Sequence, residues 1–264
     1  MIALVLLSVG LAVFALALLV RRVRPSVTQL DPRPASAMLS YVAAAFGILL
    51  GFVTVFLLGQ ASSARQAIGN EATAIGTAFD EAQLFPEAEP QLQHALICYS
   101  RAVTQEWQAL AEGRSSPAAD EAYRELIGAY GDVREPADGT FQPAAATNSF
   151  VQIGSISTAR ETRINTASFG LGPIMWVFLI GGALFVMILL FVASTPARPI
   201  TQAILLALAA MFTTLLVTLV FVLNNPFSEK AGLLTPHLIE QTTDRMVTLA
   251  PEVAARPCPI AEAG

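Results

Sequence analysis

Charge is scarce in this sequence, and cysteine is scarcer. Charged residues make up 13% of its 264 positions, against about 25% in a typical soluble domain. The net charge is −5, and no basic patch lies outside the short loops, which excludes a nucleic-acid-binding protein. The two cysteines, Cys98 and Cys258, are too few for a disulfide-rich scaffold and lack the spacing of a metal site.

The motifs of the common enzyme classes are also missing. The sequence contains no phosphate-binding loop, no dinucleotide-binding glycine pattern and no HExxH motif. His94 has no second histidine near it except the remote His237, so a surface or packed histidine is a better interpretation than a metal ligand. We therefore predict that the protein is not an enzyme and binds neither a metal nor a cofactor.

Four long apolar stretches account for the low charge. They cover about residues 2–20, 37–59, 174–194 and 200–223 and contain no charged side chain. At about 1.5 Å per residue, a helix of this length crosses a hydrocarbon core of roughly 30 Å. Together with a mean hydropathy of +0.59, these stretches predict an all-α integral membrane protein with four transmembrane helices in the lipid bilayer of the inner cell membrane.

The spans divide the chain into four predicted parts. Residues 1–59 hold spans one and two, 60–168 form an acidic helical domain, 169–227 hold spans three and four, and 228–264 form a tail. The two short connections between spans hold five arginines and one aspartate, whereas residues 60–165 hold seven arginines and fourteen acids. Since short basic loops stay in the cytoplasm, the domain and both termini are predicted to lie outside it. A disulfide between Cys98 and Cys258 would then be allowed, although the sequence does not give their separation.

Periodicity predicts the helices of the domain. Apolar or small residues recur every three or four positions beyond span two, which indicates one helix from about 37 to 84 that leaves the membrane. Further helices are predicted at about 90–112, 117–130 and 147–168, with a loop at 131–146 that is rich in Gly, Pro and Asp. The tail predicts a short amphipathic helix at 236–249 and disorder after Pro251.

Charged residues cluster at both ends of the domain. Arg65 and Glu71 follow span two, and Arg160 and Arg163 precede span three. A pair between Glu71 and Arg160 or Arg163 would tie the incoming helix to the outgoing one. Two alternatives remain open: arginines that snorkel at a helix end, and arginines that ring a vestibule and attract anions.

Two stripes within the spans are candidate pore linings. One face of span two carries Leu49, Phe52, Val53 and Phe56. These side chains either face lipid or, in a ring of subunits, form an apolar neck that gates by dewetting.

A polar stripe is formed by Thr54 in span two and by Thr214, Thr218 and Asn225 at span four. It serves either a pore or helix packing, because threonines can also bond to their own helix. Gly47 and Gly51 form a small-xxx-small pattern that predicts close helix packing.

Four stretches resemble a known family. They are GFVTVFLLGQASSARQAIGNEATAIG at 51–76, YSRAVTQEW at 99–107, ARETRI at 159–164 and NNPF at 224–227. In this combination the chain resembles the bacterial bestrophin-like family, four-span proteins distantly similar to the pentameric bestrophin anion channels. The resemblance implies a homo-oligomer, conducted ions, and a neck lined by span two. Two features depart from bestrophins: their soluble domain is cytoplasmic, and an acidic domain favours cations over anions.

Two functions fit these observations. The first is an oligomeric ion channel with span two around its axis. The second is a non-conducting membrane-anchored sensor or scaffold whose acidic domain binds a partner.

Overall fold

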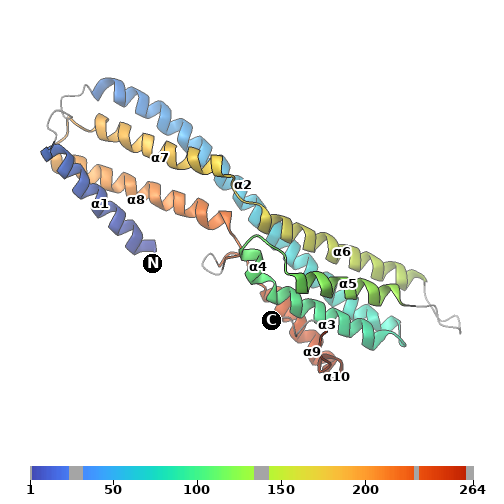
Figure 1. Ribbon diagram of the computed structural model, residues 1–264. Helices are drawn as coiled ribbons and strands as arrows, with labels where there is room; N and C mark the ends of the chain where they lie inside the picture. Colours follow the sequence, from blue (N-terminus) through green and yellow to red (C-terminus); the bar gives the residue numbers. More distant parts are fainter. Residues whose placement is uncertain (1, 24–31, 134–142, 229–231, 260–264) are drawn as a thin grey trace. The chain divides into compact units, whose positions relative to one another are not determined.

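The computed structural model describes residues 2–23, 32–133, 143–228 and 232–259, and every regular element within these ranges is a helix (Figure 1). The predicted all-α fold is therefore confirmed. The chain forms two compact units. The first comprises residues 1–58 and 171–224, and the second comprises 59–170 and 225–264.

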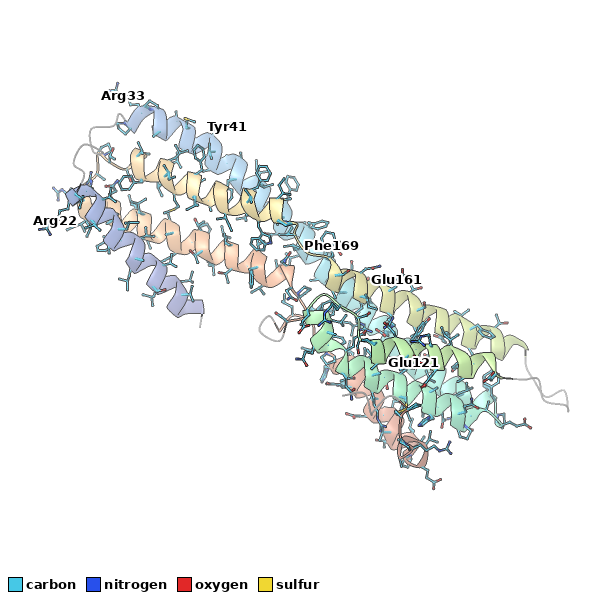
Figure 2. The ribbon with its side chains drawn as sticks, viewed as in Figure 1. Arg22, Arg33, Tyr41, Glu121, Glu161 and Phe169 are labelled. Carbon is cyan, nitrogen blue, oxygen red and sulfur yellow. A yellow bond between two sulfur atoms is a disulfide. The ribbon has the colours of Figure 1, made fainter. Side chains whose placement is uncertain are left out.

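The first unit contains four helices long and apolar enough to cross a membrane. They are α1 (Ile2–Val23), the first half of α2 (Pro32–Glu81), α7 (Pro173–Ala193) and α8 (Pro199–Asn224). Their large apolar side chains are widely exposed; Tyr41, which is 78% exposed, projects from α2 (Figure 2). Such a surface is stable only in hydrocarbon, and the predicted membrane protein is confirmed.

Small residues bring the helices of the first unit together. Ala17 of α1 packs with Ala203 and Leu206 of α8. A Cβ on Gly182 of α7 would lie 2.7 Å from the Phe46 ring of α2, so a larger residue at this crossing would have to displace that ring. Near the end of α1, Arg21 donates hydrogen bonds to the carbonyl oxygens of Thr195 and Ala197 (3.0 Å to Ala197). These bonds satisfy acceptors of the link between α7 and α8.

The second unit is a helical bundle around one apolar core. It contains the second half of α2, the 3₁₀ turn η2 (Ala82–Leu84), α3 (Glu89–Gln105), α4 (Trp107–Ala111), α5 (Pro117–Gly131), α6 (Pro143–Ser168), α9 (His237–Leu249) and α10 (Pro251–Ala254). Its core includes Ile75, Phe79, Leu92, Leu96, Leu126, Ile156 and Ile239. The continuous α2 agrees with the single helix predicted from 37 to 84.

Three predicted elements of this unit differ from the structure. The helix at 90–112 is interrupted at Glu106, whose carboxylate accepts a hydrogen bond from the Ser116 amide (3.0 Å). The loop at 131–146 is shorter than predicted, because Pro143 begins α6 and proline suits the first position of a helix; its residues 134–142 lie outside the described ranges. The disorder predicted after Pro251 is wrong for residues 251–258, because α10 and a Cys98–Cys258 disulfide hold them to the bundle; residues 260–264 lie outside the described ranges.

Candidate functional site

One face of α2 is exposed along both halves of the helix. Positions 52, 56, 59, 63, 66, 70 and 73 recur every three or four residues, so they share one face, and all seven are exposed. We name this set the α2 stripe; it consists of Phe52, Phe56, Gly59, Ser63, Gln66, Asn70 and Thr73. The stripe is apolar up to Gly59, and beyond it the side chains are polar and uncharged.

The predicted neck only partly coincides with this stripe. Phe52 is 72% exposed and Phe56 is 47% exposed. Val53 is 6% exposed and packs inside the chain, while the half-buried Leu49 lines a groove with Phe178 of α7. Val53 and Leu49 therefore face their own subunit, which leaves Phe52 and Phe56 as the neck candidates.

In the second unit the α2 stripe borders a groove between α2 and α6. The groove has a volume of about 750 Å³. Ser63, Gln66, Asn70 and Thr73 line it from α2, and α6 contributes Gln152, Ser155, Thr158 and Thr162. Hydroxyl and amide groups from two helices thus meet in one uncharged groove along the unit's surface, whose lining also includes apolar side chains such as Ala67, Ala74 and Val151.

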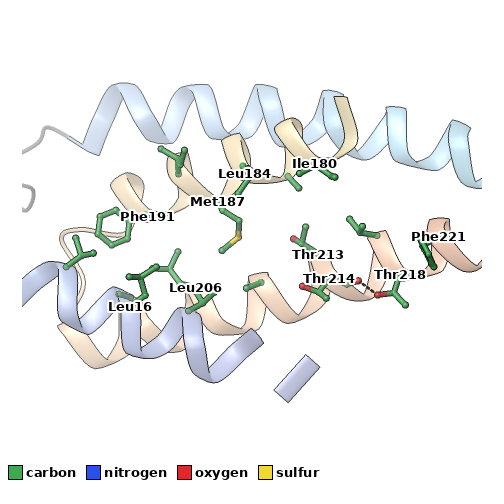
Figure 3. A pocket seen from close by; sticks show the side chains of 17 residues that line it. Leu16, Ile180, Leu184, Met187, Phe191, Leu206, Thr213, Thr214, Thr218 and Phe221 are labelled. Carbon is green, nitrogen blue, oxygen red and sulfur yellow. Dashed lines mark hydrogen bonds between the residues drawn. The ribbon is translucent and has the colours of Figure 1, made fainter. Parts of the chain in front are cut away.

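The threonines of span four do not join the α2 stripe. Thr213, Thr214 and Thr218 are the polar lining of an otherwise apolar cavity of about 690 Å³ between α1, α7 and α8 (Figure 3). The Thr218 hydroxyl donates to the Thr214 carbonyl (2.8 Å), and Thr54 donates to the Leu50 carbonyl in the same way (2.8 Å). A threonine hydroxyl bonded to its own helix suits a pore and packing equally, so the otherwise apolar lining of this cavity is what favours packing.

Asn225 was predicted to extend the stripe of Thr214 and Thr218, but it lies elsewhere. Helix α8 ends at Asn224, and Asn225 belongs to the second unit, where its Nδ2 donates to the Ala111 carbonyl (2.9 Å). The neighbouring Asn224 accepts from the Leu171 amide (2.6 Å) in the first unit. Both asparagines bond to backbone groups near helix ends, the Ala111 carbonyl at the end of α4 and the Leu171 amide before α7, which is a structural task.

A buried ion cluster forms the polar centre of the second unit. Arg163 of α6 is fully buried; its Nε and Nη2 donate to Glu71 of α2 (2.9 and 3.2 Å), and its Nη1 donates to Glu106 (2.8 Å). Both carboxylates are also fully buried. The Tyr99 hydroxyl of α3 donates to Glu71 (2.6 Å), and the Trp107 ring centroid lies 5.5 Å from the Arg163 Cζ. The Arg163 guanidinium thus joins α6 to α2 and to the α3–α4 junction, and Tyr99 attaches α3 through Glu71.

The other predicted charges have different partners. Arg160 does not contact Glu71; it pairs with Glu106 (3.3 Å) and with Asp120 of α5. Arg65 is exposed and donates to the Leu233 carbonyl (2.9 Å). Arg163 is buried and paired with Glu71, the arrangement that the first interpretation describes, so its guanidinium is not on the surface where a snorkelling or vestibule role would need it.

Burial and the neighbouring charges together set the protonation states of Arg163 and Tyr99. Desolvation lowers the pKa of Arg163, but the adjacent Glu71 and Glu106 carboxylates more than offset it and leave that pKa raised, so the guanidinium stays charged. Burial, followed by the charge of Glu71, raises the pKa of Tyr99 well above 10.0, so its hydroxyl stays a donor. A guanidinium that stays charged and a hydroxyl that stays a donor suit a cluster that fixes structure rather than one that transfers protons.

No sequence pattern predicted that Glu106 and Tyr99 would join the pair of Glu71 and Arg163. Tyr99 and Trp107 share one apolar face of the helix predicted at 90–112 with residues such as Leu92 and Leu96, and Glu106 stands next to that face in sequence. An acid beside a buried face is the signal that could have been used, since a carboxylate there needs a cationic partner.

Comparisons with known proteins agree on one relationship. The family model described as Bestrophin-like domain matches residues 5–233. The crystal structure of a bacterial bestrophin homologue from Klebsiella pneumoniae is 12% identical, covers 97% of this chain and all (100%) of its own, and superposes with a TM-score of 0.75. A variant of that homologue is 15% identical, covers 93% and 99% of the two chains, and gives a TM-score of 0.74. A search of curated proteins found no match.

Proposed function

This chain belongs to the Bestrophin-like family, and from that membership and the geometry of α2 we propose that it is the subunit of a homo-oligomeric ion channel. The α2 stripe is the observation that carries the proposal. Its apolar part at Phe52 and Phe56 would close by dewetting, and its polar part would offer ligands to a passing ion without trapping it. Conduction needs weak, repeated contacts of this kind.

Two exposed glycines support assembly of identical subunits around α2. Nothing lies within 4 Å of a Cβ built on Gly47 or Gly51, so their small-xxx-small pattern is not used for packing inside the chain. Helices of neighbouring subunits could approach closely there. The resemblance to bestrophins favours five subunits and anions, whereas the acidic second unit favours cations.

The test of channel function is ion flux through the purified chain in liposomes. We expect measurable flux of chloride or of a monovalent cation, tracked separately with anion-sensitive and cation-sensitive dyes. Subunit number is measured on the same sample by mass photometry in detergent. A monomer or dimer without flux in either assay would reject the channel and favour the membrane-anchored sensor or scaffold.

We also propose that the second unit and both termini lie outside the cytoplasm. The arginines of the short connections support this orientation, as does the Cys98–Cys258 disulfide, because such bonds persist in oxidising compartments. A reporter that fluoresces only in the cytoplasm, inserted near residue 135, is expected to stay dark, and a periplasmic enzyme reporter at the same place is expected to be active. The reverse pattern would overturn the orientation.

A further inference from the structure

The Cys98–Cys258 disulfide lies against a histidine. The Cys98 Sγ is 3.5 Å from the Nε2 of His94, one helical turn earlier on α3. The ligand atoms of His94, Cys98 and Cys258 all lie within 4.8 Å of one another. His94 was interpreted above as a surface or packed histidine because no second histidine lies near it in sequence. Cys258, the third member of this cluster, is 160 residues from Cys98 in sequence.

From this cluster we propose that the disulfide is the oxidised form of a zinc site, in which His94, Cys98 and Cys258 bind Zn²⁺ once the disulfide is reduced. Two ligands at positions i and i+4 of one helix project to the same side, as in helical zinc motifs. Zn–S bonds of about 2.3 Å and Zn–N bonds of about 2.0 Å give a tetrahedral S···N edge of about 3.5 Å. The His94–Cys98 separation already has this length.

Only the two sulfur atoms must separate for a metal to bind. The tetrahedral S···S edge is about 3.8 Å, and Cys258 can supply the movement, because it follows the end of α10 at Ala254, whereas Cys98 is held within α3. A cavity of about 340 Å³ beside the disulfide leaves room for water as the fourth ligand. Arg101, whose Nη1 is 3.9 Å from the Cys258 Sγ, would offset the charge of the thiolates.

The chemistry balances with an external dithiol as the reductant. The dithiol transfers two electrons and two protons to the Cys98–Cys258 bond and becomes a disulfide itself, leaving two thiols on the protein. Zn²⁺ then displaces both thiol protons and takes the neutral His94 nitrogen as its third ligand. In both the disulfide and the zinc-bound states the C-terminal segment is tied to α3 at Cys98. In the reduced, metal-free state that tie is lost, and the contacts of α10, including the hydrogen bond from Arg101 to the Ala254 carbonyl (3.2 Å), remain.

Zinc titration of the full-length chain in detergent tests the proposal. After reduction by a phosphine, which does not compete for metal as a dithiol would, we expect one Zn²⁺ per chain against a chromophoric chelator, and none before reduction. Replacing zinc by Co²⁺ should give thiolate-to-metal charge-transfer absorption. His94→Ala should weaken zinc binding by more than about 100-fold, which exceeds the loss expected when a residue that only hydrogen-bonds to a metal ligand is removed.

His237→Ala is the matched control, because His237 is the second of the two histidines and lies at the start of α9; its zinc affinity should be unchanged. Circular dichroism and a thiol count on the oxidised His94→Ala variant check that the fold and the disulfide are retained. Absence of zinc from the reduced chain would overturn the proposal. Equal affinity in the His94→Ala and unmodified chains would do the same.

Discussion

Replacing Glu71 by glutamine is expected to lower the free energy of unfolding of the second unit by about 3–5 kcal/mol, the cost of breaking a buried ion pair by removing one partner. Glutamine keeps the shape of Glu71 and one acceptor oxygen, so the loss comes from charge. Arg163 would then be left fully buried with Glu106 as its remaining carboxylate partner in the cluster. Because domains are stable by only about 5–15 kcal/mol, much of the second unit's stability would disappear.

Denaturant unfolding in detergent measures this loss, with tryptophan fluorescence as the probe because Trp107 lies beside Arg163. Glu161→Gln is the matched control: Glu161 is on α6 two residues from Arg163, but it is exposed (Figure 2). Its substitution should change stability by less than about 0.5 kcal/mol. Similar unfolding curves for Glu71→Gln and Glu161→Gln would show that the buried cluster does not stabilise the bundle.

Alanine in place of both Phe52 and Phe56 is expected to raise ion flux in liposomes by about tenfold or more. Removing two aromatic rings per subunit would widen an apolar neck and let water enter it, which lowers the barrier to ion passage. Every reduction of that barrier by about 1.4 kcal/mol speeds passage tenfold. Both side chains are exposed on the surface of α2, so the substitution should cost little stability.

A matched pair of phenylalanines lies elsewhere in the first unit. Phe178 of α7 is 61% exposed and Phe212 of α8 is 62% exposed, so their double alanine variant removes the same apolar area outside the α2 stripe. Its flux should equal that of the unmodified chain. If both double variants raise flux equally, the increase reflects a loosened membrane unit and not a neck at Phe52.

Length, polarity and helical periodicity were enough to predict most of the architecture. Four uncharged stretches have few stable structures other than membrane helices, and the spacing of Ile68, Ile75 and Phe79 continued span two into the second unit. Hydropathy and helical periodicity predicted these helices because each helix depends on residues close together in sequence. The pairing of Glu71 with Arg163 was among the alternatives because both lie near a membrane boundary.

Side-chain direction within an apolar span could not be predicted in the same way. Phe52 and Val53 are adjacent and both suit lipid, a neighbouring helix or a neck, so composition does not distinguish them. Contacts between distant segments were equally hidden: Glu106 joins Arg163 across 57 positions, and Cys258 reaches Cys98 across 160. Such contacts depend on how whole helices pack, which local periodicity does not encode.

Charged modification of a cysteine at position 66 tests most directly whether the α2 stripe lines the ion pathway. Both native cysteines are held in the disulfide, so Gln66→Cys supplies a unique reactive thiol, and Gln241→Cys on the exposed face of α9 is its control. We predict that a charged methanethiosulfonate reagent changes flux through the Gln66→Cys protein by about tenfold and leaves the Gln241→Cys protein unaffected. Complete modification of Gln66→Cys with unchanged flux would contradict the account.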